Sequence, residues 1–403
     1  MRSNQLREHV REFRQFHAGG ILALLALASG CGAAPDANDT PSDVAATSQA
    51  LRCVDEWGNP SDDPNCPWVS AWGEVSPDGG GANITHTKSP AVCVAGNVLI
   101  VSVDTQNRYR TLAFNGDEFA TSWGSYGTRT FSSSPTCAPQ GTSSSSFVLA
   151  GKSSTDNKIY ASSGTMGLAA SPPNPTAGPF AVVDNGHTYS SGGNPAAASN
   201  DNGVVLVAMG TDSRTIFSYW HSLPYAQHSW SQRITGPQLP SGSSASGTPA
   251  IVFLPQSQVF HVVVRSNNAM FQTYVSATGG TFTNSGGQGV AAFDVLGLPG
   301  PYSSDPALTY ATASDLETLL YLSNTKIMQT SATSFMPLLG TFPVLPMPGL
   351  PMQGQFGGPP NFTGAPAAIG IPLDVTFSAA DVFSRFGNRI AYTQSIDSGQ
   401  LGP

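Results

Sequence analysis

The chain has 403 residues and a formal net charge of −8, and only 10% of its residues are Asp, Glu, Lys or Arg. A protein that neutralises nucleic-acid phosphates needs a clustered basic surface, so this composition excludes nucleic acid as a partner. The low charge content, with 43 glycines and abundant Ser, Thr and Asn, is typical of an exported all-β protein.

The first 31 residues have the pattern of an export signal. Four arginines lie within the first fourteen residues, an apolar run follows at 21–28, and small residues lead into Cys31. The run is too short to span a membrane, and no other stretch approaches that length. The segment resembles the cleavage box of bacterial lipoproteins, although Ala28 stands where that box usually has Leu. This resemblance implies a signal peptide at 1–30 and lipidation of Cys31; ordinary secretion is the alternative.

Residues 31–66 are rich in Ala, Asp, Pro, Ser and Thr, which predicts a flexible acidic tether before a folded domain at 67–403. Gly32, and not Asp, follows Cys31. By the same resemblance, this favours the outer membrane or cell surface of a Gram-negative type of bacterium. The membrane is therefore expected as a partner only through the lipid on Cys31.

The folded domain opens with a succession of strand-length runs at 89–124. The runs PAVCV, VLIVSV, RYRTLAF and FATSW alternate with the breaks GN, TQN and NGD, whose residues tolerate positive φ. This order predicts a four-stranded antiparallel meander in fewer than forty residues.

The same pattern returns along the chain. A Pro followed by a small residue precedes each apolar run, and a turn rich in Asn, Asp and Ser follows the run. The prolines are Pro90, Pro135, Pro195, Pro249, Pro306 and Pro366. One such sheet cannot bury both of its faces alone, so six copies predict a six-bladed β-propeller; tandem sandwiches would need about 100 residues each. The blades are expected to begin near residues 89, 134, 194, 248, 305 and 365.

The two ends of the domain predict how the ring closes. The sixth copy ends after its third strand, whereas Trp68–Gly73, before the first copy, resembles Phe119–Gly124 at the end of copy one. We therefore expect the N-terminal strand to complete the last blade. Such closure leaves no unpaired edge between the first and last blades.

Four cysteines remain after Cys31, an even number that suggests two disulfides in an exported protein. Cys93 and Cys137 occupy matching places in the first strands of copies one and two, and Cys53 and Cys66 are close in sequence. We expect the pairs Cys93–Cys137 and Cys53–Cys66. Zinc is the competing interpretation, but no C-x-x-C motif and no His at ligand spacing accompany these cysteines.

Few residues of the domain can support catalysis. Its only glutamates are Glu74, Glu118 and Glu317, its histidines are scattered, and no zinc, nucleophile-elbow or phosphate-loop motif occurs. Ser395–Gly399 resembles half of the Asp-box of sialidase-like propellers, which is a structural turn. The sequence therefore predicts a protein that is not an enzyme and that holds no cofactor or metal.

The blade SPAV…VLIVSV…TQNRYRTLAFNGDEFATSWG resembles those of bacterial and fungal propeller lectins that bind fucose and related sugars. The resemblance covers most of 68–403 as a blade pattern and is clear in copy one, but no copy has a full Arg–Glu–Trp set. In those families a pocket between blades holds the sugar against an aromatic face, with Arg, Glu and backbone groups on its hydroxyls. The resemblance implies glycans or glycoconjugates as partners.

Six residues are candidate sugar contacts, four of them in copy three, where aromatic residues are most frequent. They are Tyr219, Trp220, Trp230, Arg214, Trp123 and Arg108. Packing between blades is the alternative for the tryptophans. Solvation beside a hairpin turn is the alternative for the basic residues, since a basic residue opens or nearly opens the third strand in five copies. These are Arg108, Lys158, Arg214, Lys326 and Arg389.

A stretch rich in Pro, Gly and Met separates copies five and six at 336–364. We expect an apolar flap on the ring there, with a partner-docking loop as the alternative.

Two further functions are alternatives to carbohydrate binding. One is a protein-interaction scaffold in the cell envelope, and the other is a glycosidase, which would need carboxylates gathered at one end of the channel.

Overall fold

The computed structural model describes residues 52–53, 68–69, 72–115, 118–141, 145–167, 174–183, 189, 193–201, 203–221, 230–267, 269–278, 281–283, 292–311, 315–333, 345–346, 361–372 and 378–397. All belong to one of the two units of the chain, Ala50–Pro403. The signal peptide, Cys31 and nearly all of the tether lie outside these residues, so their assignments stay predictions. In the described part, no helix is long and apolar enough to cross a membrane.

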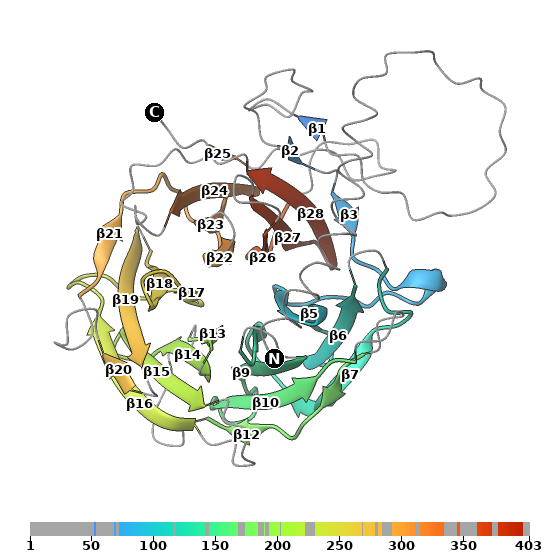
Figure 1. Cartoon of the computed structure of the whole chain (residues 1–403), viewed down its shortest axis with the longest axis horizontal. Helices are drawn as coiled ribbons and strands as arrows, with labels where there is room; N and C mark the ends of the chain where they lie inside the picture. The colour runs from blue at the N-terminus through green and yellow to red at the C-terminus, as the bar shows by residue number, and fades with distance from the viewer. Residues whose placement is uncertain are drawn as a thin grey trace, which may run out of the picture. The chain divides into compact units, whose positions relative to one another are not determined.

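The described strands form six antiparallel sheets, each a blade of a β-propeller (Figure 1). Blade one contains β4 (Ala91–Ala95), β5 (Asn97–Val103), β6 (Arg108–Phe114) and β7 (Gly124–Thr130). Blade two contains β8 (Thr136–Pro139), β9 (Ser146–Lys152), β10 (Ile159–Thr165) and two short outer strands, β11 (Thr176–Ala177) and β12 (Ala181–Val182). Blade three contains β13 (Ala196–Asn200), β14 (Gly203–Met209), β15 (Arg214–His221) and β16 (Trp230–Gln238).

The second half of the ring repeats this order. Blade four contains β17 (Ala250–Leu254), β18 (Val259–Arg265), β19 (Met270–Thr278), β20 (Thr281–Thr283) and β21 (Asp294–Leu296). Blade five contains β22 (Ala307–Ala311), β23 (Leu316–Ser323), β24 (Lys326–Thr333) and β25 (Leu345–Pro346). Blade six contains β26 (Ala367–Pro372), β27 (Ser378–Phe386), β28 (Arg389–Asp397) and the N-terminal β1 (Arg52–Cys53), β2 (Trp68–Val69) and β3 (Gly73–Glu74). A single 3₁₀ turn, η1 (Asp78–Gly80), precedes blade one in the described chain.

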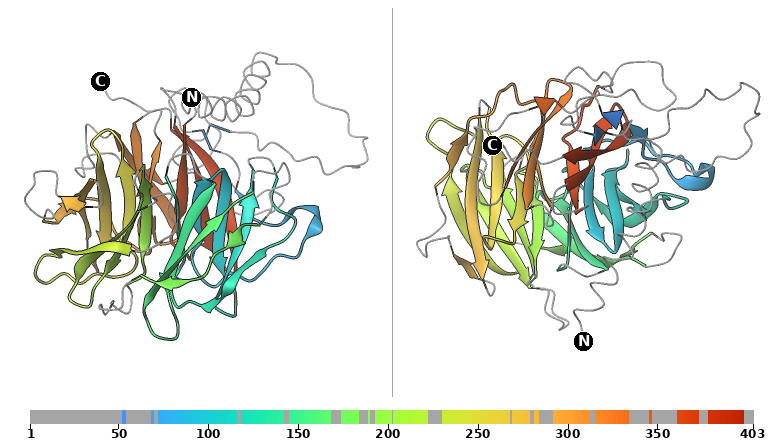
Figure 2. Two further views of the ribbon diagram at one scale, coloured as in Figure 1. Left: turned by 60° about the horizontal axis from the view of Figure 1, so that its bottom comes forward. Right: turned by 45° about the horizontal axis from the view of Figure 1, so that its top comes forward.

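The ring is closed by the N-terminal strand, as the sequence predicts. Trp68 of β2 pairs with Ile396 of β28, and Glu74 of β3 pairs with Ala391 of the same strand. The six inner strands contact one another in sequence order, and β26 also contacts β4. Figure 2 shows the blades in two oblique views, arranged around the common axis. Residues near the start of the domain therefore lie against the last blade.

A Ser or Thr three residues before the repeated Pro attaches the start of a blade to its second strand. In five blades its backbone N–H donates to the carbonyl at the end of that strand, over 2.8–2.9 Å. The donors are Thr87, Ser132, Ser246, Ser303 and Thr363, and their acceptors are Val103, Lys152, Arg265, Leu322 and Arg385. In four of these blades the hydroxyl donates to the same carbonyl. In five of the six copies the repeat is therefore Ser/Thr-x-x-Pro, a signal beyond the Pro alone.

The turn between the second and third strands contains the left-handed residues that the sequence predicts. The φ angles of Asn107, Asn157, Ser213 and Asn324 are 59°, 57°, 60° and 57°. Asn reaches this region at lower cost than most residues because its short side chain can hydrogen-bond locally. A basic residue follows the turn in five blades. Arg108, Arg214, Lys326 and Arg389 are the first residues of β6, β15, β24 and β28, and Lys158 directly precedes β10.

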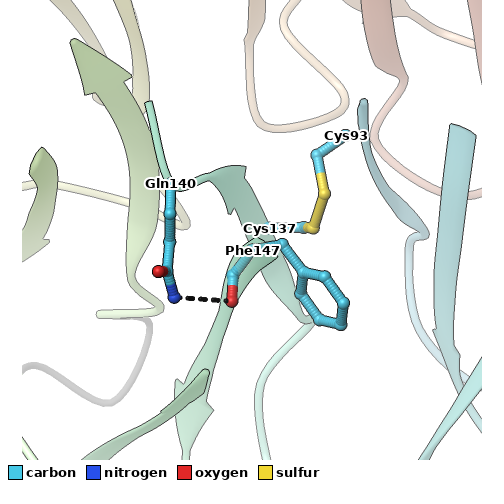
Figure 3. The surroundings of a disulfide bond; sticks show 4 residues. All are labelled: Cys93, Cys137, Gln140 and Phe147. Atoms are coloured by element: carbon cyan, nitrogen blue, oxygen red, sulfur yellow. Dashed lines mark hydrogen bonds between the residues drawn. A yellow bond between two sulfur atoms is a disulfide. The ribbon is translucent and has the colours of Figure 1, made fainter. Parts of the chain in front are cut away.

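A disulfide joins Cys93 of β4 to Cys137 of β8, whose Cα atoms are 5.6 Å apart (Figure 3). Both cysteines are buried, and the bond connects the inner strands of blades one and two. The predicted Cys93–Cys137 pair is confirmed. Only the backbone of Cys53 is described and Cys66 lies outside the described residues, so their pairing stays a prediction.

Replacing both Cys93 and Cys137 by Ser should lower the free energy of unfolding by about 2–4 kcal/mol, because the cross-link restricts the unfolded chain. The two cysteines are 44 residues apart in the chain. Urea denaturation of the double variant measures the loss, and wild-type protein treated with reductant serves as the matched control. A double variant with the urea midpoint of the oxidised wild type would contradict a stabilising role.

Candidate functional site

A polar cluster lies where blade six meets blade one. We call it the seam cluster: Arg389 at the start of β28, Glu74 at the end of β3, Asn83 in the segment before β4, and Trp123 just before β7. Arg389 and Glu74 are 315 residues apart in the chain. They meet only because β3 pairs with β28.

The register of the closing strands explains this meeting. Glu74 lies directly opposite Ala391, two residues after Arg389 on the same strand. Residues two apart on a strand point to the same face, and a long side chain reaches the diagonal neighbour. The Arg389 Nη1–Glu74 Oε2 distance is 2.7 Å, that of a charge-assisted hydrogen bond.

Hydrogen bonds connect this ion pair to the aromatic ring. The Asn83 side-chain amide donates to Glu74 Oε1 at 3.0 Å and to the Val75 carbonyl at 3.1 Å. The Trp123 indole N–H donates to Asn83 Oδ1 at 2.9 Å. Arg389, Glu74, Asn83 and Trp123 thus form one continuous network across the junction.

The charged end of the network is open to solvent and the aromatic end is not. The Arg389 side chain is 51% exposed and that of Glu74 is 28% exposed, whereas Trp123 is only 9% exposed. Trp123 therefore packs mainly between blades, which was the alternative to sugar contact considered for the tryptophans. The exposed groups combine guanidinium donors, carboxylate acceptors and an amide that does both.

His86 supports the seam from the inside. Its ring lies edge-on to Trp123, with the ring centroids 4.9 Å apart, and its Nδ1 is 2.9 Å from the Ser102 hydroxyl. Burial and, to a smaller extent, the charge of Arg385 together lower the pKa of His86 to about 4. A neutral imidazole is therefore the form present at neutral pH.

The structure separates the residues that the sequence groups in copy three. Arg214 begins β15 and Trp220 is next to its last residue, so the two lie roughly 20 Å apart along the strand. The Arg214 side chain instead meets Asp212 and Gln238 at the turn, at 3.4 and 3.2 Å. Arg214 therefore cannot share one small site with Trp220.

The backbone at the other end of β15 places two aromatic residues opposite each other. Trp220 pairs with Trp230 of β16, and Tyr219 pairs with Gln232. The side chains of Tyr219, Trp220 and Trp230 lie outside the described residues. Their role as sugar contacts stays a prediction.

Arg108, the remaining candidate, is exposed at the start of β6 beside a turn. Asp104 organises this turn by accepting hydrogen bonds from the backbone N–H of Gln106 and Arg108 and from Arg110 Nε. Burial alone would raise the pKa of Asp104, but these hydrogen bonds bring it below its usual value. Arg108 is therefore an exposed residue beside an ordered turn.

A second polar group, which the sequence analysis does not single out, lies buried between blades four and five. His261 Nδ1 of β18 is hydrogen-bonded to Glu317 of β23, and His261 Nε2 is 3.1 Å from Gln272 Oε1. The His261 and Glu317 side chains are 0% and 1% exposed. Tyr274 stacks on His261 with ring centroids 4.4 Å apart. Burial raises the pKa of Tyr274, and the charges of Glu317 and Asp294 raise it further.

The wall nearest the axis is uncharged. None of the residues in the inner strands β4, β8, β13, β17, β22 and β26 is Asp, Glu, Lys or Arg. Within the described ranges, no three His, Cys, Asp or Glu side chains are grouped to hold a metal ion. The inner strands therefore supply no acid–base pair, and the charged groups of the seam cluster lie farther out.

Comparison with known proteins identifies a fold and no family. No family model and no curated protein matches the chain. AofleA from Arthrobotrys oligospora matches with a TM-score of 0.52 at 8% identity, over 83% of this chain and 91% of that one.

Two further solved structures match less well. The Aleuria aurantia lectin, a six-bladed propeller that recognises fucose, has a TM-score of 0.44 at 12% identity, over 66% of this chain and 81% of the lectin. Trypanosoma rangeli sialidase has a TM-score of 0.49 at 10% identity, and this chain spans 58% of its length and is itself covered over 82%. At 8% identity, the match to AofleA supports the propeller fold and assigns no ligand.

Proposed function

We propose that the protein binds carbohydrate without hydrolysing it, and that the seam cluster is a sugar-binding site. The observation that carries the proposal is the exposed Arg389–Glu74 ion pair, joined through Asn83 to Trp123. Sugar hydroxyls both donate and accept hydrogen bonds, so a guanidinium, a carboxylate and an amide held close together can fix several of them. Because the groups already hold one another in place, little side-chain freedom is lost on binding.

The positions of the carboxylates favour binding over hydrolysis. A glycosidase needs two carboxyl groups on either side of the scissile bond. In the seam cluster, Glu74 is the single carboxylate and is paired with Arg389. Glu317 is buried against His261 and is closed to a sugar ring. These placements support a lectin-like function over a glycosidase.

We further propose that the propeller is exported and attached to the outer membrane or cell surface. The proposal rests on the sequence alone, through the signal at 1–30, Cys31 and the tether at 31–66. A tether of this length would let the seam cluster meet glycans away from the bilayer.

A glycan array tests the proposed site when wild-type protein is compared with Glu74→Gln. We expect saturable binding of the wild type to a defined sugar, and at least about tenfold weaker binding of Glu74→Gln. The lost carboxylate removes a charge-assisted hydrogen bond, worth about 1.5–3 kcal/mol. Asp212→Asn is the matched control, since Asp212 forms an exposed ion pair with Arg214 on blade three.

The outcomes separate the hypotheses. Loss of binding in Asp212→Asn but not in Glu74→Gln would move the site to blade three. No binding of folded wild-type protein to any glycan would reject the proposal and leave the protein-interaction scaffold as the account to test.

A further inference from the structure

Two blades carry an arginine at the same position at the end of their second strand. Val263 of β18 pairs with Ala250, and Phe383 of β27 pairs with Ala367, where Ala250 and Ala367 are the first residues of their inner strands. Arg265 and Arg385 each lie two residues further along. The two arginines are therefore structural equivalents in blades four and six.

Arg265 has a carboxylate partner from the next blade. Its Nη2 is 3.1 Å from Asp305 Oδ1, and its Nη1 donates to the Tyr302 carbonyl at 3.3 Å. Asp305 immediately precedes Pro306, the repeated Pro of blade five. At the junction of blades four and five, the charge of Arg265 is thus neutralised by Asp305, which stands directly before the repeated Pro.

Arg385 has no such partner. The residue before the repeated Pro of blade one is Ser89, and its hydroxyl accepts a hydrogen bond from the Ala365 N–H at 2.8 Å. Arg385 donates to the carbonyls of Gly387 and Thr363, at 2.7 and 3.4 Å, and forms no ion pair with a described carboxylate. Its Nε is buried without a partner, as is that of Arg265. The difference between the two junctions is therefore the missing carboxylate.

The position of that missing carboxylate borders Gly364. A Cβ placed on Gly364 would lie 2.8 Å from Arg385 Cβ, 3.1 Å from Ser89 Oγ and 3.4 Å from Arg385 Nε. The equivalent glycine of blade four is Gly247, and a Cβ there would overlap Asp305 Oδ1. The residue before the repeated Pro is thus Asp305 at the junction of blades four and five. At the junction of blades six and one it is Ser89, whose hydroxyl leaves the charge of Arg385 without a carboxylate.

His86 adds a second unpartnered donor to this junction. Its backbone N–H donates to the Asn388 carbonyl of the preceding turn, as those of Phe131 and Phe362 do to their preceding turns. His86 therefore stands where two other blades have Phe. Its side chain is 1% exposed, and Nε2 has no partner. When Ser102 donates a hydrogen bond to Nδ1, the imidazole proton is on Nε2, and this N–H can donate a hydrogen bond to an anion.

We propose that Arg385 and His86 bind a small carboxylate anion at the junction of blades six and one, at the place that Asp305 occupies between blades four and five. A half-buried cation without a counter-ion is costly, and a bound carboxylate would offset that cost. This site differs from the seam cluster in its residues and its ligand, and its test does not depend on sugar binding.

The test measures the unfolding temperature of the purified protein in increasing sodium acetate at constant ionic strength. Sodium chloride serves as the comparison salt. For the wild type, we expect a saturable rise of about 4 °C at a hundredfold excess over Kd, in acetate and not in chloride. Ser89→Asp supplies the carboxylate within the chain, so this variant should lose the response to acetate. Ser89→Asn has the same shape without the charge and should keep it.

Two further variants keep the test decisive if Ser89→Asp does not fold. Arg385→Gln should lose the response, and Arg265→Gln, the equivalent change in blade four, should keep it. An equal rise in acetate and chloride, no rise in the wild type, or a response retained in Arg385→Gln would each overturn the proposal.

Discussion

Lowering the pH from 6.5 to 4 should cost the wild type about 3 kcal/mol more of its free energy of unfolding than it costs a His86→Phe variant. The pKa of His86 is lowered to about 4 by burial and by the Arg385 charge, from an ordinary value of 6.5. Each unit by which the pKa of His86 differs between the folded and unfolded chains corresponds to about 1.4 kcal/mol of stability.

The direction follows from which state binds the proton. Above pH 6.5 the imidazole is neutral in both states, so its full contribution to stability is present. Between pH 6.5 and 4 the unfolded chain takes up a proton that the folded ring does not, and stability falls. Below about pH 4 both states are protonated and the dependence on His86 ends.

Urea denaturation at half-unit pH steps measures this difference. His86→Phe is a suitable control because Phe131 and Phe362 occupy the equivalent positions of blades two and six. The wild type and His86→Phe contain the same carboxylates. Their contributions to the pH dependence cancel when one stability curve is subtracted from the other. Parallel stability curves for the two proteins from pH 6.5 to 4 would show that His86 is not held neutral by the fold.

Glu317→Ala should lower the free energy of unfolding by about 3–5 kcal/mol, the cost of removing one partner of a buried polar pair. Glu317 and His261 are almost fully buried between blades four and five, and the variant leaves the imidazole without an acceptor at Nδ1. The Glu317 side chain is only 1% exposed, so a sugar cannot reach its carboxylate. The effect should therefore appear in stability and not in glycan binding.

A double variant separates the pair from its surroundings. Replacing His261 by Phe and Glu317 by Leu removes both polar groups and retains apolar volume, so it should cost much less than Glu317→Ala alone. Chemical denaturation of the wild type, the single variants His261→Phe and Glu317→Leu, and the double variant gives the coupling between the two positions. A loss below about 1 kcal/mol in Glu317→Ala would contradict a stabilising role for the hydrogen bond.

The fold was predictable because its signals are local and repeated. Six prolines, six apolar runs and turns with Asn or Ser at left-handed positions all have the same order, and each copy alone describes one sheet. The resemblance of Trp68–Gly73 to the end of copy one also predicted closure of blade six by the N-terminus. Strand pairing of β2 and β3 with β28 confirms it.

The candidate site was less predictable because it depends on contacts between distant segments. Trp123 was recognised from its own copy, but its partner Asn83 precedes the first strand, and Glu74 reaches Arg389 only through ring closure. In copy three, closeness in sequence was misleading, since Arg214 and Trp220 share a strand but lie at opposite ends of it. The buried pair of His261 and Glu317 left no local pattern at all.

The central claim is that a sugar binds at the junction closed by the N-terminal strand. The most direct test is a crystal structure of the protein with a sugar that it binds on the array. We predict sugar density within hydrogen-bonding distance of Arg389 and Glu74 at the start of β28 and the end of β3. Density instead at the paired residues Trp220 and Trp230 of blade three, with the seam cluster empty, would contradict the account.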